Sequence, residues 1–191
     1  MRKRLLNFWV DEDVLTRFKR KHQNVSARLR ELILSDLNND IEQRVSRNNL
    51  SLFRKIVLED GLPIQVCGNV GIGKSTLMKK LIETTNGRVF VVFDSHNEYD
   101  LPVVQTITDD LSQPCKVVLP EQPSAAKGLF PLYANQILSR RWPTNFCFII
   151  EEAHRYKDAR LLLREGRKFT KVVTVSPEPL IKSCKVVRVV A

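Results

Sequence analysis

The 191-residue sequence lacks several features that would assign it to a familiar class. Its four cysteines are far apart and form no C-x-x-C pair, so neither a disulfide framework nor a zinc site is indicated. No apolar run reaches the roughly 18 residues that a membrane-spanning helix requires, and the chain shows no internal repeat. We therefore expect a protein of the cytoplasm, or of the host cytoplasm if a virus or plasmid encodes it, with no membrane partner.

The composition points to a polyanionic partner. The formal net charge is +10 and the isoelectric point is near 9.7, and a field of that sign attracts nucleic acid. The length leaves room for one medium domain with a small appendage, or for one larger domain.

Residues 1–37 read as strand, helix, turn and helix. Alternating apolar residues predict a strand at 4–10, Asp11 is a candidate N-cap for the first helix, and Ser26 is one for the second. One strand and two short helices cannot bury a core alone. The segment resembles the ribbon-helix-helix fold, in which two chains pair their strands into a ribbon that enters the DNA major groove.

This resemblance implies a DNA-binding and dimerisation module. Its ribbon would face the groove with Leu5, Asn7 and Trp9, and the second helix would hold a phosphate at its N-terminus. The DNA-binding residues expected from it are Arg2, Lys3, Arg4, Asn7 and Ser26. A helical hairpin that serves only oligomerisation is the alternative.

A linker and a helix are expected over residues 38–60. Residues 38–49 are rich in asparagine and charge, so they are either an extension of the preceding helix or a solvated linker. Apolar spacing predicts a helix over 50–59, and Gly61 ends it. The remaining residues, 61–191, are expected to form the main domain.

The most informative stretch is 68–76, which fits G-x-x-x-x-G-K-[ST] between a predicted strand at 63–67 and helical spacing from 77 to 82. Three of the seven glycines fall here, where a backbone without Cβ atoms can wrap phosphate oxygens at a helix N-terminus. Lys74 would then reach the β/γ-phosphates and Ser75 would hold Mg²⁺. The expected nucleotide-binding residues are Gly68, Asn69, Val70, Gly71, Ile72, Gly73, Lys74, Ser75 and Thr76. A chance match in a glycine-rich turn is the alternative.

Two other predicted strands end in polar residues. The strand at 88–94 runs into the cluster 94–99, and the uniformly apolar strand at 145–150 ends in Glu151 and Glu152. Ligands gather at the carboxyl ends of parallel strands. Glu151 would bind Mg²⁺ through water, and Glu152 would polarise the attacking water. A charged start to the next helix is the alternative.

Further elements follow from the same patterns. Strands are predicted at 115–119 and 171–175, and a helix is predicted over 125–142, broken near Pro131.

Together these motifs resemble the HerA/FtsK superfamily of DNA-pumping ATPases. Residues 94–99 follow the pattern D-x-H-x-E-Y, residues 151–154 read E-E-A-H, and residues 164–169 read R-E-G-R-K-F. The resemblance is to compact versions found in mobile elements and viral genome packaging. It implies an α/β, RecA-type P-loop NTPase core with a parallel central sheet, preceded here by a small β-α-α module.

The resemblance also implies a mechanism and partners. ATP and Mg²⁺ would be the cofactors, Lys74 and Glu152 catalytic, and Ser75 and Glu151 the metal site. Members form rings, usually hexamers, around double-stranded DNA, with an arginine supplied by a neighbour; Arg167, or else Arg164, is the candidate, and a surface ion pair is its alternative role. The family usually has a glutamine where this chain has Pro177.

The sequence therefore predicts a DNA-binding ATPase that couples ATP hydrolysis to DNA translocation or packaging. The alternative is an ATP-gated DNA-binding regulator or assembly factor without processive translocation, which Pro177 favours. A small-molecule kinase is a weaker third reading.

Overall fold

The computed structural model describes Thr16 and residues 42–59, 63–120, 123–166, 170–181 and 184–191. The chain divides after Asn39, and apart from Thr16 the described residues belong to the unit Asp40–Ala191. The ribbon-helix-helix prediction for residues 1–37 therefore lies outside the described residues.

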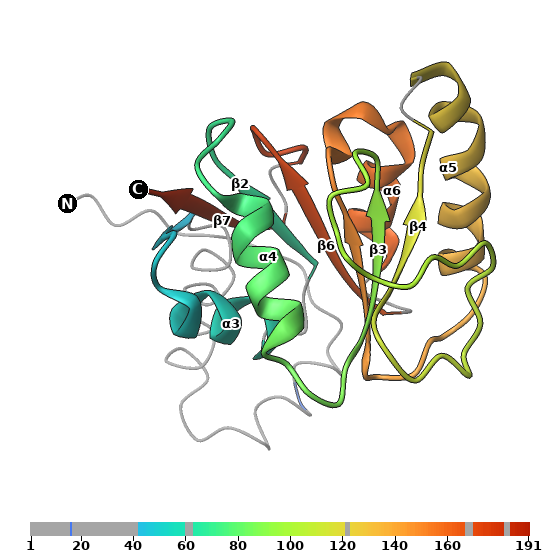
Figure 1. Ribbon diagram of the computed structural model, residues 1–191, viewed down its shortest axis with the longest axis horizontal. Coiled ribbons are helices and arrows are strands. Elements are labelled where there is room, and N and C mark those ends of the chain that lie inside the picture. The colour runs from blue at the N-terminus through green and yellow to red at the C-terminus, as the bar shows by residue number, and fades with distance from the viewer. Residues whose placement is uncertain (1–15, 17–41, 60–62, 121–122, 167–169, 182–183) are drawn as a thin grey trace. The chain divides into compact units, whose positions relative to one another are not determined.

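The described part of Asp40–Ala191 is an α/β fold with a seven-stranded, all-parallel sheet and four helices (Figure 1). The strand order is β1-β7-β2-β6-β5-β3-β4. In chain order the elements are β1 (Gln43–Ser46), α3 (Leu50–Glu59), β2 (Ile64–Cys67), α4 (Lys74–Glu83), β3 (Val89–Asp94), β4 (Cys115–Val118), α5 (Pro123–Leu138), β5 (Phe146–Ile150), the short 3₁₀ helix η1 (Ala153–Arg155), α6 (Lys157–Glu165), β6 (Lys171–Ser176) and β7 (Lys185–Val190).

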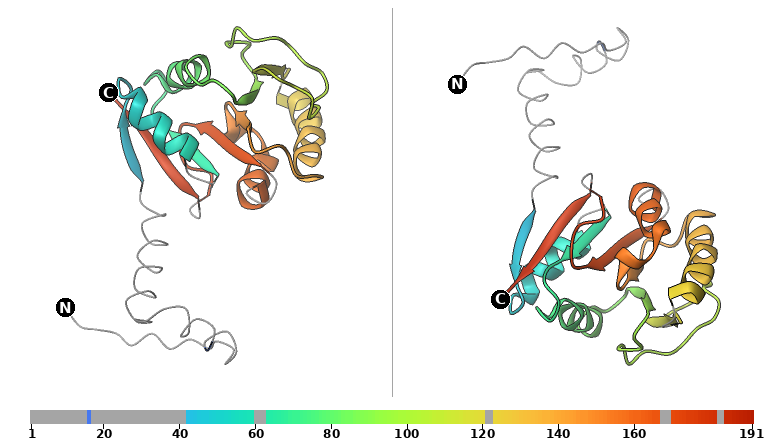
Figure 2. Two further views of the ribbon diagram at one scale, coloured as in Figure 1. Left: turned by 90° about the horizontal axis from the view of Figure 1, so that it is seen from below. Right: turned by 90° about the horizontal axis from the view of Figure 1, so that it is seen from above.

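The sheet is buried by helices on both faces (Figure 2). Alternate strand residues pack with α3 and α4 on one face, among them Val66, Phe90 and Ile149. Their neighbours on the other face, including Phe148, pack with α5, η1 and α6. Strands covered on both sides must be apolar throughout, which accounts for the continuous apolar runs at β3 and β5.

The predicted strands at 63–67, 88–94, 115–119, 145–150 and 171–175 are confirmed to within about one residue of each end. The helix over 50–59 is also confirmed, as α3. Residues 43–46 differ from the linker or helix extension expected there, because they form β1 and pair with β7. Of the four residues of this edge strand, Val45 alone is fully buried, and the partner strand β7 lies far along the chain. The local spacing of apolar residues therefore gives little indication of a strand here.

The helix α5 does not break where the sequence suggested. It runs from Pro123 to Leu138 with Pro131 inside it. Proline removes one backbone donor and crowds the preceding turn. Burial of Phe130, Ala134 and Ile137 along one side of the helix outweighs that local cost.

The strand order determines which loops meet. Since every described strand pair is parallel, the carboxyl ends of the strands share one edge of the sheet. The strand β6 lies between β2 and β5, so the segments that follow these three strands are neighbours.

Candidate functional site

The loop 68–73 connects β2 to α4 and depends on glycine at its two ends. Gly68 has a φ of 147°, and a Cβ there would lie 2.7 Å from the carbonyl oxygen of Val189. Gly73 has a φ of 99° directly before the first residue of α4. Side chains are disfavoured in both conformations, so this curled path requires glycine at these positions.

Lys74 folds back over the loop. Its side chain is largely buried, and Nζ donates hydrogen bonds to the carbonyl oxygens of Gly68 at 2.8 Å and Asn69 at 3.1 Å. The ammonium group is therefore held beside the loop by backbone acceptors. Asn69, Val70 and Gly71 are exposed, which leaves the outer side of the loop open to a ligand.

Glu151 follows the last residue of β5 and is only 5% exposed. Each carboxylate oxygen accepts one hydrogen bond from a hydroxyl group. Ser75 Oγ, in the first turn of α4, donates to Oε2 at 3.5 Å, and the Tyr99 hydroxyl donates to Oε1. Burial raises the pKa of Glu151 from 4.5 to about 7, and the hydrogen bond from Tyr99 partly opposes this rise.

Glu152 adopts a backbone conformation that is unusual for its residue type. Its φ of 49° and ψ of 37° are left-handed, and non-glycine residues held there are often found at functional sites. The side chain is about one-third exposed, and Oε2 lies 3.6 Å from Nε2 of His154. Glu151 therefore points into the protein while Glu152 reaches solvent at the same edge.

The turn after β6 lies against the glycine loop. The carbonyl oxygen of Pro177 accepts a hydrogen bond from the backbone N–H of Gly68 at 3.1 Å. Ser176 Oγ closes the turn by donating to the carbonyl oxygen of Glu178 at 2.7 Å. Proline at position 177 thus offers the loop a carbonyl oxygen and no polar side chain.

The sequence predicts residues 94–99 at this edge, and the structure confirms that placement. The sequence patterns do not identify Tyr99 as a partner of Glu151, nor Lys116 as part of the site. Lys116 Nζ donates to Asn97 Oδ1 at 2.7 Å and to the carbonyl oxygen of Tyr99. The sequence does offer one indication that Lys116 has a functional or structural role, because it is a lysine within the otherwise apolar strand β4.

The structure brings most of the predicted site residues together. The glycine loop, Lys74, Ser75, Glu151 and Glu152 share the carboxyl edge of the sheet, and Thr76 is exposed one residue further into α4. Arg164 is exposed near the end of α6. The other predicted residues lie outside the described part of the chain: Arg2, Lys3, Arg4, Asn7, Ser26 and Arg167.

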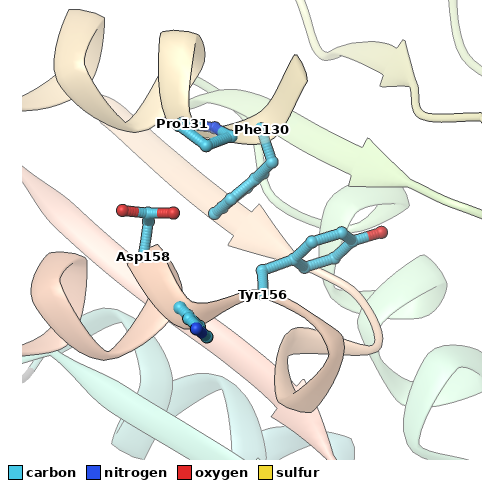
Figure 3. Close-up of a pocket in the computed structure, with 5 residues that line it drawn as sticks. Phe130, Pro131, Tyr156 and Asp158 are labelled. Atoms are coloured by element: carbon cyan, nitrogen blue, oxygen red, sulfur yellow. The ribbon is translucent and has the colours of Figure 1, made fainter. Parts of the chain in front are cut away.

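A pocket elsewhere is a poorer candidate. It lies between α5 and the start of α6, has a cavity volume of about 200 Å³, and is lined by Phe130, Pro131, Tyr156, Lys157 and Asp158 (Figure 3). The rings of Phe130 and Tyr156 stack there with centroids 4.6 Å apart. Ligand pockets usually exceed about 300 Å³, so this small cavity is a less suitable nucleotide site than the open loop edge.

Comparisons with known proteins assign no family. No protein-family model matches the chain, and searches of the curated proteins and of the solved structures gave no match. Within the described residues, no helix is long and apolar enough to cross a membrane. The same residues contain no cluster of three or more histidine, cysteine, aspartate or glutamate side chains that could hold a metal ion.

The raised pKa of Glu151 predicts that the unfolding free energy of the protein depends on pH even when no ligand is bound. The folded state binds this proton more tightly than the unfolded state, so the unfolding free energy falls as pH rises from 4.5 to about 7. The full shift corresponds to about 3 kcal/mol. Relative to the wild type, Glu151→Gln should therefore gain thermal stability between pH 4.5 and pH 8, measured by calorimetry in EDTA.

Glu83→Gln is the matched control, because Glu83 is an exposed carboxylate on α4. Its melting temperature relative to the wild type should change little over the same range. If the difference in melting temperature between Glu151→Gln and the wild type does not change with pH, burial does not raise the pKa of Glu151.

Proposed function

We propose that this protein is an Mg²⁺-dependent ATPase whose nucleotide site is a P-loop formed by residues 68–75 within a RecA-type core. The observation that carries the proposal is the meeting of three groups at one sheet edge. A curled glycine loop, the amine of Lys74 and the hydroxyl of Ser75 come together, and Ser75 Oγ lies 3.5 Å from the buried carboxylate of Glu151.

The residues present fit both nucleotide phosphates and magnesium. The loop leads into the N-terminus of α4, where unpaired backbone N–H groups and the helix dipole favour anions. Lys74 already sits beside the loop and would transfer its hydrogen bonds to phosphate oxygens. Ser75 and Glu151 are oxygen donors, which Mg²⁺ prefers, and one or two protein ligands suffice where phosphates and waters complete the shell.

In this proposal the residues divide the chemistry. Bound Mg²⁺ would neutralise charge developing on the phosphates. Ser75 and Glu151 hold that ion, Lys74 stabilises phosphate charge, and Glu152 accepts the proton of the attacking water. The partly exposed side chain of Glu152 suits a base that must reach a water molecule outside the protein core.

DNA is the partner that the remaining observations favour. The net charge of +10 suits a polyanion, and the motif set resembles that of the HerA/FtsK superfamily, including its compact viral and mobile-element forms. In such a protein, double-stranded DNA would pass through a ring of subunits, with Arg167 or Arg164 completing a neighbouring site. Residues 1–37 would add DNA binding and pairing of chains.

An ATP-gated DNA-binding regulator without processive movement is the second candidate. The turn at 176–178 favours it, because Pro177 has no side chain that could sense a phosphate and its carbonyl oxygen is already bound to Gly68. In that case ATP would change the assembly of the protein on DNA.

Two substitutions separate nucleotide binding from hydrolysis. Lys74→Ala should weaken ATP binding by at least about tenfold, because it removes a charged hydrogen-bond donor. Glu152→Gln should retain binding and lower turnover by about 10²- to 10⁴-fold, the usual contribution of a general base. Equilibrium binding of a fluorescent ATP analogue and steady-state phosphate release measure the two effects.

Lys80→Ala is the matched control, since Lys80 is exposed further along the same helix. It should leave both measurements within about twofold of the wild type, well below the tenfold loss that one charged contact contributes. Equal loss of binding in Lys74→Ala and Glu152→Gln would contradict the division of roles. Absence of ATP binding by the wild type at saturating Mg²⁺ would overturn the proposed function.

DNA should stimulate ATP turnover, and the stimulation should decline steeply with salt because phosphate contacts release counterions. A pump should also use ATP to displace a protein roadblock bound to linear double-stranded DNA. A regulator would change a footprint without displacing the roadblock. Turnover that DNA leaves unchanged would instead support a small-molecule kinase.

Whether Arg167 acts in its own subunit or in a neighbouring one can be tested by mixing variant subunits. Arg167→Ala should lose hydrolysis and retain nucleotide binding, because the arginine stabilises charge in the transition state. If it acts across an interface, mixing Arg167→Ala with Glu152→Gln should restore part of the activity, because some interfaces would then be intact. No recovery in mixtures shown by native mass spectrometry to contain both subunits would place the arginine within its own subunit.

A further inference from the structure

The hydroxyl group of Tyr99 occupies one oxygen of the carboxylate that the proposed function assigns to magnesium. It donates to Glu151 Oε1, while Ser75 donates to the other oxygen, Oε2. Tyr99 is 2% exposed and comes from the turn after β3, whereas Ser75 belongs to α4. With Oε1 engaged by Tyr99, the carboxylate is held so that Oε2 faces Ser75.

The turn that carries Tyr99 is itself built around Asp94. The buried carboxylate of Asp94 accepts hydrogen bonds from the backbone N–H of Tyr99 at 2.9 Å and of His96 at 3.2 Å. Asn97 lies between them with a left-handed φ of 52°, a conformation that asparagine tolerates better than most residues. The path of the turn is therefore fixed at its backbone.

Lys116 braces the same turn from the neighbouring strand β4. The residue is only 7% exposed, and Nζ donates to Asn97 Oδ1 at 2.7 Å and to the carbonyl oxygen of Tyr99. Burying an ammonium group is costly unless acceptors compensate it. Both of these acceptors belong to the turn, so the lysine couples the position of β4 to the position of Tyr99.

We propose that Tyr99 is a positioning residue for magnesium, with Lys116 and Asn97 acting through it. In this role the Tyr99 hydroxyl selects which carboxylate oxygen of Glu151 is presented beside Ser75. The proposal rests on the nucleotide site described above and adds residues that the glycine-loop and paired-glutamate motifs do not contain. Hydrogen bonds to a metal ligand from such outer groups typically contribute 10- to 100-fold in metal affinity or activity.

The decisive variant is Tyr99→Phe, which keeps the ring and removes the hydroxyl. Affinity for a fluorescent ATP analogue is measured in EDTA and over a Mg²⁺ titration, together with the melting temperature. The Mg²⁺ concentration that gives half of the gain in affinity should rise about tenfold. Affinity in EDTA should stay within about twofold of the wild type, because among the described residues no hydrogen bond joins Tyr99 to the glycine loop.

Tyr133→Phe is the matched control. The Tyr133 hydroxyl, on α5, also donates one hydrogen bond, but its acceptor is the carbonyl oxygen of Gln105 at 2.9 Å and not Glu151. Its Mg²⁺ response should equal that of the wild type.

Two further variants test the brace. Lys116→Met keeps the aliphatic length and removes the donor, while Asn97→Gly tolerates the left-handed turn and removes the acceptor. Both should shift the Mg²⁺ midpoint in the same direction as Tyr99→Phe, and by less. They also decide the question if Tyr99→Phe does not fold.

Three results would overturn the inference, and they can be told apart from failure of the proposed function. A lower melting temperature with an unchanged Mg²⁺ midpoint would show that the hydroxyl only satisfies a buried carboxylate. If Tyr99→Phe loses as much nucleotide affinity in EDTA as in Mg²⁺, the substitution distorts the nucleotide site in general. A wild type that binds no nucleotide under any condition would refute the proposed function itself, and this inference with it.

Discussion

The buried carboxylate of Glu151 is the group on which the arrangement of the site depends. A buried carboxylate is costly unless hydrogen-bond donors compensate it, and the raised pKa of Glu151 reflects the part of the burial cost that its hydrogen bonds leave uncompensated. Its two donors come from segments that follow different strands, Ser75 after β2 and Tyr99 after β3. Satisfying one carboxylate therefore holds α4, the turn after β3 and the end of β5 together at one edge of the sheet.

The order of the strands makes this meeting possible. The strand β6 separates β2 from β5, and neighbouring strands lie about 4.8 Å apart, so the glycine loop and Glu151 begin roughly two strand spacings from each other. The first turn of α4 spans this gap and brings Ser75 within 3.5 Å of Glu151. The turn after β6 follows the strand that lies between β2 and β5, and there the carbonyl oxygen of Pro177 accepts a hydrogen bond from the backbone N–H of Gly68. A sheet in which β2 and β5 were adjacent would leave no room for that turn.

Much of this could be predicted from the sequence because the buried strands are uniformly apolar and the motifs sit at their ends. The apolar run before Glu151 gave both the strand β5 and the place of the two glutamates. The contribution of Lys116 could not be found in this way, because its acceptors at Asn97 and Tyr99 are brought close only by strand pairing. The strand β1 was missed for a related reason: its four residues contain one buried side chain, and its stability comes from pairing with β7. Such elements form because of tertiary contacts, whereas the central strands can be predicted from the local spacing of apolar residues.

The edge formed by β1 and β7 also supports the glycine loop, although it carries none of the recognised motifs. The carbonyl oxygen of Val189 on β7 approaches Gly68 so closely that no side chain fits there, and Arg47, which follows β1, lies 3.8 Å from where a Cβ of Gly73 would be. Arg188 on β7 donates to Glu42 at 2.6 Å and 3.1 Å and to Glu178 at 3.4 Å, so it joins the start of β1 to the turn that holds the loop. In the described sheet β7 lies between β1 and β2, so removing residues before 61 would delete β1 and α3 and expose the edge of β7 beside the loop. Among the described residues, this frame therefore extends back to Glu42, well before the first motif residue.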